Sequence, residues 1–293
     1  VYKMPSLLNA KEYMSMMDER RFNEGNAGYD WANLLPTGLY EGIQNGTWNG
    51  TNWMEEIRNK NALTQNHAFN LVGGTDMSKF SMGFSYTSQE GILGTPAESQ
   101  FDRYTARINS DHVLLKGNGF DIITIGENLL YNYRERQGIA TGDIYWNDVH
   151  NMLVANPLLP VYDADGNYYD QNDKDREGRL YDGGTSNPIG EMVYSSRGQN
   201  LSKNHSLRAN AYIEIQPILN LKFKSVFGYN MSSNSYRSYA QEHKLSTTSQ
   251  RLYNEVTQNA GSGYDISWEN TLAYSFKISD HSFDALVGQS ILK

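Results

Sequence analysis

Apolar and polar residues alternate along several stretches of the chain with a period of two. In residues 79–87, Phe80, Met82, Phe84 and Tyr86 take the even positions, while lysine, serine, glycine and threonine take the odd ones. Because successive side chains of a strand point to opposite faces, this pattern predicts a β-strand with one apolar and one polar face. The same alternation, weaker in the first, third and last segment, occurs at 66–73, 103–109, 121–133, 207–216, 221–231, 264–277 and 282–290.

The connections between these segments alternate between short and long. Short turns are expected at 74–78, 115–119, 216–220 and 279–281, and long connections at 1–64, 88–100, 134–203 and 232–262. Outer-membrane barrels combine short periplasmic turns with longer extracellular loops, and in an up-and-down barrel every second connection lies on the same side. The order therefore predicts an all-β fold, an antiparallel up-and-down transmembrane β-barrel fragment of about eight strands.

On this interpretation the long extracellular loops contain short helices, and residues 6–14 have the composition of one. The predicted division of the chain is an extracellular loop at 1–64, strands at 65–133, a long extracellular loop at 134–203, and strands at 204–293 interrupted by the loop 232–262.

The two faces of each strand make different predictions. The apolar positions of 79–87 are expected to contact lipid, and Ser81, Gly83 and Ser85 to face the lumen. A soluble antiparallel sandwich, whose strands also alternate, is the alternative. The length of the strands and the arginine, lysine, glutamate and asparagine residues on their polar faces favour the barrel, because a lumen is wet.

Two features refine the predicted lipid face. Aromatic residues near strand ends, such as Tyr104 and Tyr133, are typical of the girdles at a membrane interface. Glu127 shares a face with Ile125 and Leu129. Either a bulge that shifts the register or a position at headgroup level would explain this carboxylate.

Composition excludes several classes of protein. Hydrophobic residues make up 39% of the chain and no run of about 18 apolar residues occurs, which excludes a bundle of membrane-spanning helices. The formal net charge is -8 and no stripe of basic residues occurs, so nucleic acid is not an expected partner. The absence of cysteine removes thiol catalysis and disulfides.

Neither catalysis nor a cofactor is expected. The sequence has no nucleophile elbow, phosphate-binding glycine loop or zinc-binding helix motif, and its six histidines lack metal-ligand spacing. The acidic loop 163–175 offers oxygen ligands suited to calcium, although its spacing is not that of an EF-hand. A hairpin turn at Asp165-Gly166 explains the loop without a metal, and calcium binding is the alternative.

Aromatic residues of the long loops are the candidate substrate-binding residues. Flat aromatic rings with polar tips can stack on sugar rings in a wet site. The alternative is that these side chains pack the loops together or anchor a lid protein. The candidates are Trp48, Trp53, Tyr145, Trp146, Tyr168 and Tyr169.

Several short blocks resemble the early barrel of SusC/RagA-like TonB-dependent transporters, and they occur in the same order. The resemblance runs over essentially the whole chain, and the ordered set is more specific than any one block. The blocks include residues 7–13 (LLNAKEY), 51–57 (TNWMEEI), 72–76 (VGGTD), 101–104 (FDRY), 125–129 (IGENL), 160–168 (PVYDADGNY) and 268–272 (WENTL).

The resemblance implies a large plugged barrel of about 22 strands, of which the chain holds roughly strands two to nine. Its two end strands should then be open edges. The family's plug and TonB box would precede Val1, and the chain indeed opens without a start methionine or a leader. The implied function is TonB-driven import of an oligosaccharide, or of a peptide, across the outer membrane of a Gram-negative, Bacteroidota-like cell, with a SusD-like lipoprotein as partner. The alternative is a structural or adhesive outer-membrane β-protein without a transport role.

Overall fold

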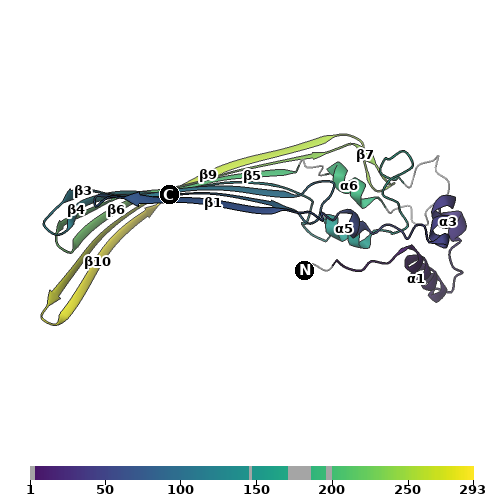
Figure 1. Cartoon of the computed structure of the whole chain (residues 1–293), viewed down its shortest axis with the longest axis horizontal. Helices are drawn as coiled ribbons and strands as arrows, with labels where there is room; N and C mark the ends of the chain where they lie inside the picture. The colour runs from purple at the N-terminus through teal and green to yellow at the C-terminus, as the bar shows by residue number, and fades with distance from the viewer. Residues whose placement is uncertain (1–3, 145–146, 171–185, 196–199) are drawn as a thin grey trace.

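Eight long strands form one antiparallel sheet, and helices and loops gather at one end of it (Figure 1). This computed structural model describes residues 4–144, 147–170, 186–195 and 200–293. We call the eight-stranded sheet the wall and the described residues in 4–63, 91–99, 138–200 and 241–254 the cap. The wall consists of β1 (Thr64–Gly74), β2 (Ser78–Glu90), β3 (Gln100–Lys116), β4 (Asp121–Gln137), β5 (Leu201–Ile218), β6 (Leu221–Ala240), β9 (Glu255–Ile278) and β10 (His281–Leu292).

The wall is a meander, because its strand order β1-β2-β3-β4-β5-β6-β9-β10 follows the chain. All eight predicted strands are present, every neighbouring pair is antiparallel, and β1 and β10 are the two edges. The described residues provide no second sheet packed against the wall, so the predicted meander is confirmed and the sandwich alternative is wrong. No helix in these ranges has the length and apolar character needed to cross a bilayer.

Several strands are longer than the alternation predicted. β6 continues to Ala240 and β9 begins at Glu255, so the loop predicted at 232–262 covers only 241–254. The extra residues pair continuously from Ser232↔Gly263 to Ala240↔Glu255. Ladder hydrogen bonds need no apolar side chains, and here both strands are rich in serine, asparagine and glycine, so the alternation fades while the pairing continues.

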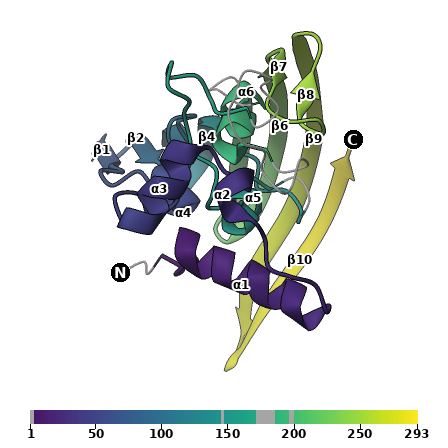
Figure 2. The same cartoon turned by 90° about the vertical axis from the view of Figure 1, so that its right-hand side faces the viewer.

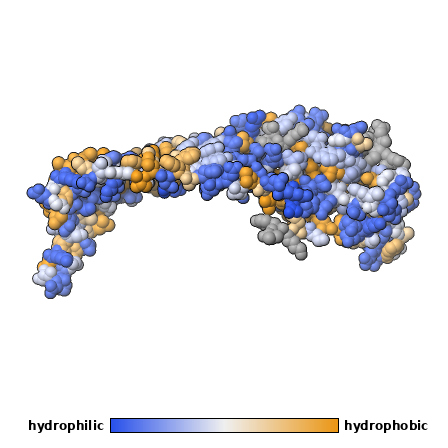
Figure 3. All heavy atoms as spheres, viewed as in Figure 1, coloured by the Kyte–Doolittle hydropathy of each residue, from blue (hydrophilic) through white to orange (hydrophobic). Residues whose placement is uncertain are grey.

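The register gathers the apolar positions of all the strands on one face of the wall. Cross-strand partners share a face, and one row runs through seven strands. Its members are Phe69, Phe84, Ala106, Tyr131, Leu207, Met231 and Tyr264. Figure 3 shows orange atoms over the middle of the sheet. We call this side the apolar face and the opposite side the polar face.

Aromatic rings form a ladder on the apolar face, near the end of the wall that carries the cap. Tyr86 lies 4.8 Å from Tyr104 between ring centroids, and Tyr104 lies 6.0 Å from Tyr133. His205 continues the ladder, 4.7 Å from Tyr133. Three strands thus bring tyrosines to one level, which is the arrangement expected of an interfacial girdle.

Glu127 lies on the apolar face without any shift of register at its own position. It pairs with Ser110 on one side and Ala211 on the other. The bulge alternative is therefore wrong for this residue, and the bulge in β3 lies at Val113 to Leu115. The Glu127 carboxylate instead accepts a hydrogen bond from the Ser110 hydroxyl, so a neighbour in the same row satisfies it.

The hydrophobic core lies in the cap, and no buried hydrophobic side chain among the described residues comes from the eight strands. Two clusters form it, one around Trp53, Met152 and Met192, the other around Leu35 and Leu158. Figure 2, viewed from the cap end, shows the helices grouped in front of the strand ends. The cap contains α1 (Ala10–Asn23), α2 (Trp31–Leu34), α3 (Thr37–Asn45), α4 (Trp53–Glu56), α5 (Asp148–Val154), α6 (Pro188–Ser195), and the two-residue strands β7 (His243–Lys244) and β8 (Gln250–Arg251).

The first helix begins with a complete capping box. Asn9 accepts a hydrogen bond from the Glu12 backbone N–H at 3.0 Å, and the Glu12 carboxylate accepts one from the Asn9 backbone N–H at 2.9 Å. Ala10, Met14 and Met17 form the buried stripe, at the spacing that places side chains on one helical face. The helix suggested by residues 6–14 is therefore present, but it begins at Ala10 and extends to Asn23.

Candidate functional site

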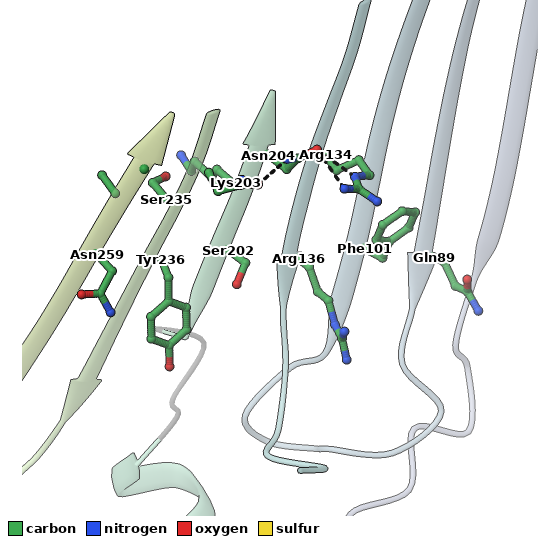
Figure 4. A pocket seen from close by; sticks show the side chains of 13 residues that line it. Gln89, Phe101, Arg134, Arg136, Ser202, Lys203, Asn204, Ser235, Tyr236 and Asn259 are labelled. Carbon is green, nitrogen blue, oxygen red and sulfur yellow. Dashed lines mark hydrogen bonds between the residues drawn. The ribbon is translucent and has the colours of Figure 1, made fainter. Parts of the chain in front are cut away.

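A groove of about 930 Å³ lies on the polar face, at the end of the wall that carries the cap (Figure 4). Adjacent strands build it, because one register row crosses the groove from β2 to β9. The row consists of Gln89, Phe101, Arg136, Ser202, Tyr236 and Asn259, all of which line the groove. The site therefore combines amide, hydroxyl, aromatic and guanidinium groups on a rigid sheet.

Arg134 lies one row deeper and is held by an asparagine ladder. Its Nε and Nη2 groups donate to the Oδ1 atom of Asn204 at 3.2 and 2.8 Å. The Asn204 amide in turn donates to Asn234 on β6. These contacts, drawn as dashed lines in Figure 4, fix the position of the guanidinium without neutralising its charge.

Strand alternation separates the charges around this groove. Arg103, Arg134 and Arg136 project to the polar face, whereas their sequence neighbours Asp102 and Glu135 project to the apolar face. Asp102 accepts a hydrogen bond there from the Tyr86 hydroxyl at 2.9 Å, and Glu135 pairs with Lys203 at 3.6 Å. Among the described residues, none of the three arginines forms an ion pair.

The predicted aromatic site residues lie in the cap, and none of the four that are described lines the groove. Trp53 is 1% exposed, and its Nε1 group donates to the Asn156 carbonyl at 3.0 Å. Tyr169 is also buried, whereas Trp48 and Tyr168 are half-buried against the two clusters. The four predicted aromatic residues that the structure describes thus divide into two buried rings and two rings with accessible surface.

Two of the predicted site residues, Tyr145 and Trp146, lie outside the described residues. Of the other four, Tyr168 packs against two tyrosine rings: its centroid is 5.3 Å from that of Tyr162 and 5.6 Å from that of Tyr194. Those contacts leave part of the Tyr168 ring exposed at the cap surface.

The described part of the acidic loop is a turn, as expected for Asp165-Gly166. The Asp163 carboxylate accepts hydrogen bonds from the backbone N–H groups of Asp165 at 2.9 Å and Asn167 at 2.8 Å. Gly166 takes a φ of 83°, which favours glycine, and Tyr162 bridges to Tyr168 across the turn. Residues 171–175 of the loop lie outside the described residues, and the described ranges contain no cluster of three possible metal ligands.

One carboxyl in the cap has a perturbed acidity. Burial raises the pKa of Asp148, the first residue of α5, above its ordinary value, and the Ala140 backbone N–H, which donates to the carboxylate at 2.7 Å, lowers this pKa in part. Glu191 adds a smaller upward contribution through charge repulsion. Asp148 lines a second cavity, of about 540 Å³, inside the cap.

The groove was missed in the analysis of the sequence, although a signal for it was present. The segments Asp102-Arg103 and Arg134-Glu135-Arg136 are close to neutral when read as a run of charges. If their charges are assigned to alternate faces, as apolar residues were, three arginines fall on one face and two carboxylates on the other.

No protein-family model and no curated protein matches the chain. Among solved structures it is similar to the RagAB peptide transporter, with a TM-score of 0.72 and 17% identity over 98% of this chain and 32% of that chain. It is also similar to the RagAB peptide importer in the open-open state, with a TM-score of 0.64 and 19% identity over 83% of this chain and 25% of that chain. The chain thus spans a quarter to a third of these proteins. Its fold is that of one portion of the barrel of a SusC/RagA-like transporter, as the sequence resemblance implied.

Proposed function

We propose that the chain forms part of the wall of a TonB-dependent outer-membrane transporter that imports an oligosaccharide or peptide nutrient. The observation that carries this proposal is the continuous apolar face, which presents its large side chains outward: Phe69 is 64% exposed and Phe84 and Phe227 are 50% exposed. Side chains of this kind suit contact with outer-membrane lipid. The polar face then lines the lumen, and the cap lies outside the cell.

Two partners belong to this proposal. A SusD-like surface lipoprotein covers the lumen entrance from the cap side, and the TonB complex acts through a region outside this chain. The similarity to a RagAB transporter described as a peptide importer supports a peptide substrate, while accessible rings in the cap suit sugars. Trp48 and Tyr168 are the described rings best placed to stack on a sugar, and Tyr145 and Trp146 stay candidates.

Uptake by the full-length protein tests the proposal. Cells that carry the transporter and its neighbouring lipoprotein should accumulate labelled oligosaccharide or peptide, and deletion of the TonB gene should abolish accumulation while the barrel stays in the outer membrane. Equal accumulation with and without TonB would contradict the proposal. A barrel that is present but imports neither class of oligomer would favour the alternative, a structural or adhesive surface protein.

A further inference from the structure

The sign of the charge on the polar face changes along the wall, although the whole chain carries a net charge of -8. Near the cap, two adjacent rows contain Arg103, Arg134 and Arg136 and no carboxylate. Glu255, at the cap end of β9, also lies on this face but is paired with Arg251. Beyond the arginine rows, the first carboxylate on this face is Asp265, in the row that Arg208 shares. The entrance half of this face is therefore cationic.

Acidic residues of the polar face lie mainly toward the opposite end of the wall, and several of them are already engaged. Asp111 accepts a hydrogen bond from the Tyr212 hydroxyl, and Glu214 pairs with Lys222 at 3.0 Å. These carboxylates are too far along the strands to neutralise the arginines of the groove. Among the described residues of the same face, no carboxylate forms an ion pair with these arginines, because Glu255 is paired with Arg251.

The arginines of the groove keep donors available. Arg134 directs Nε and Nη2 to one amide oxygen, and its other N–H groups make no hydrogen bond or ion pair with the described residues. Arg136 has no hydrogen-bond or ion-pair partner in the described ranges. A guanidinium matches a carboxylate through two parallel hydrogen bonds, so this arrangement suits planar anions. Phe101 and Tyr236 flank Arg136 and Ser202 in the same row and offer ring surface for the body of a ligand.

We propose that this groove binds the carboxylates of an anionic nutrient and selects acidic oligomers over neutral ones. The inference rests on the proposed transport function and adds the charge class of the substrate. Two sources supply the same chemistry: an oligosaccharide built from uronic acids and a short peptide rich in glutamate. Arg134 and Arg136 make the direct contacts, and Asn204 holds Arg134 in position.

The test compares charged and neutral probes on the full-length transporter with its lipoprotein. The probes are tetragalacturonate against neutral galactotetraose, and tetraglutamate against tetraglutamine. The variant is the double substitution Arg134→Gln and Arg136→Gln. A matched control is Arg237→Gln, which removes an exposed arginine from the apolar face near the same end of the wall.

We expect the double variant to lose about tenfold to a hundredfold of its affinity for the acidic probe, because hydrogen bonds to charged groups contribute about 1.5–3 kcal/mol. Uptake of neutral probes and the amount of folded barrel should stay unchanged, and Arg134→Lys with Arg136→Lys should recover part of the preference. The acidic probe that the wild type binds shows whether the substrate is a uronic-acid oligosaccharide or a glutamate-rich peptide. Equal loss for acidic and neutral probes, or a wild type without acidic preference, would overturn the inference while transport itself stands; failure to import any probe would instead count against the proposed function.

Discussion

The wall and the cap use apolar side chains in opposite ways. Every buried hydrophobic residue in the described ranges belongs to the cap, where Trp53 and Met152 are at most 1% exposed. The wall exposes its apolar residues, and Leu286, Val287 and Val72 are each more than 70% exposed. The cap thus holds its own core as a water-soluble domain does, whereas the apolar side chains of the wall stay exposed on its surface.

The largest expected effect comes from removing the central ring of the cap. Trp53→Ala should destabilise the cap by about 3–5 kcal/mol, because it leaves a cavity and removes the indole hydrogen bond to the Asn156 carbonyl. Limited proteolysis of the full-length barrel in membranes should then cut the cap readily, while the amount of heat-modifiable barrel stays constant. Trp48→Ala, at a half-buried ring, should show a smaller change. Loss of the whole barrel in Trp53→Ala would show that the two regions do not fold independently.

A charge on the apolar face should impair assembly of the wall, whereas Trp53→Ala should affect only the cap. Phe84→Arg or Ile213→Arg should reduce assembly, because arginine facing lipid costs about 2–4 kcal/mol at the midplane and about 0–1 near the interface. The matched substitutions Ser85→Arg and Asn210→Arg lie on the polar face and should leave the barrel assembled. The measurement is the heat-modifiable fraction in outer membranes. If all four variants assembled equally, the assignment of the faces to lipid and lumen would be wrong.

Loss of the N-terminal capping residue of α1 should cause an intermediate loss of stability that is confined to the cap region. Asn9→Ala removes the side chain that caps α1 and should cost about 1 kcal/mol. Tryptophan fluorescence during thermal unfolding should report it through Trp31, which packs in the same cluster as α1. Glu19→Ala, at an exposed position of the same helix, serves as the control. An equal shift in both variants would mean that the capping box contributes nothing specific.

The smallest effect concerns pH. Because burial raises the pKa of Asp148 in the folded cap, the folded state holds this proton more tightly than the unfolded state. Stability of the cap should therefore fall as pH rises from the ordinary aspartate range through the raised pKa, and should be greater in mild acid than at neutral pH. Asp148→Asn, which keeps an acceptor for the Ala140 N–H, should remove this slope. Hydrogen exchange of α5 between pH 4 and 7 measures it, and an unchanged slope in the variant would assign the pH dependence to other groups.

Sequence predicted the wall better than the cap, for a physical reason. A strand's faces are set by alternation between near neighbours, so Phe80 to Tyr86 sufficed to assign a strand and its two faces. The cap depends on contacts such as that between Trp53 and Asn156, which are 103 positions apart and follow no period. The basic groove lies between these cases: Arg134 and Arg136 share a face of β4 by alternation, but only the pairing of β3 with β4 brings Arg103 beside them.

The length of β6 and β9 has a mechanical consequence. Nine to eleven residues suffice for a strand to cross a bilayer, whereas β9 has 24 residues, and its pairing with β6 is unbroken up to the cap. A sheet joined by continuous ladder hydrogen bonds resists shear between its strands, and no unpaired segment interrupts this one between the apolar face and the β7–β8 loop. Sideways displacement of the cap on this side must therefore bend the paired β6 and β9 strands together, so the hairpin couples movement of the cap to the wall.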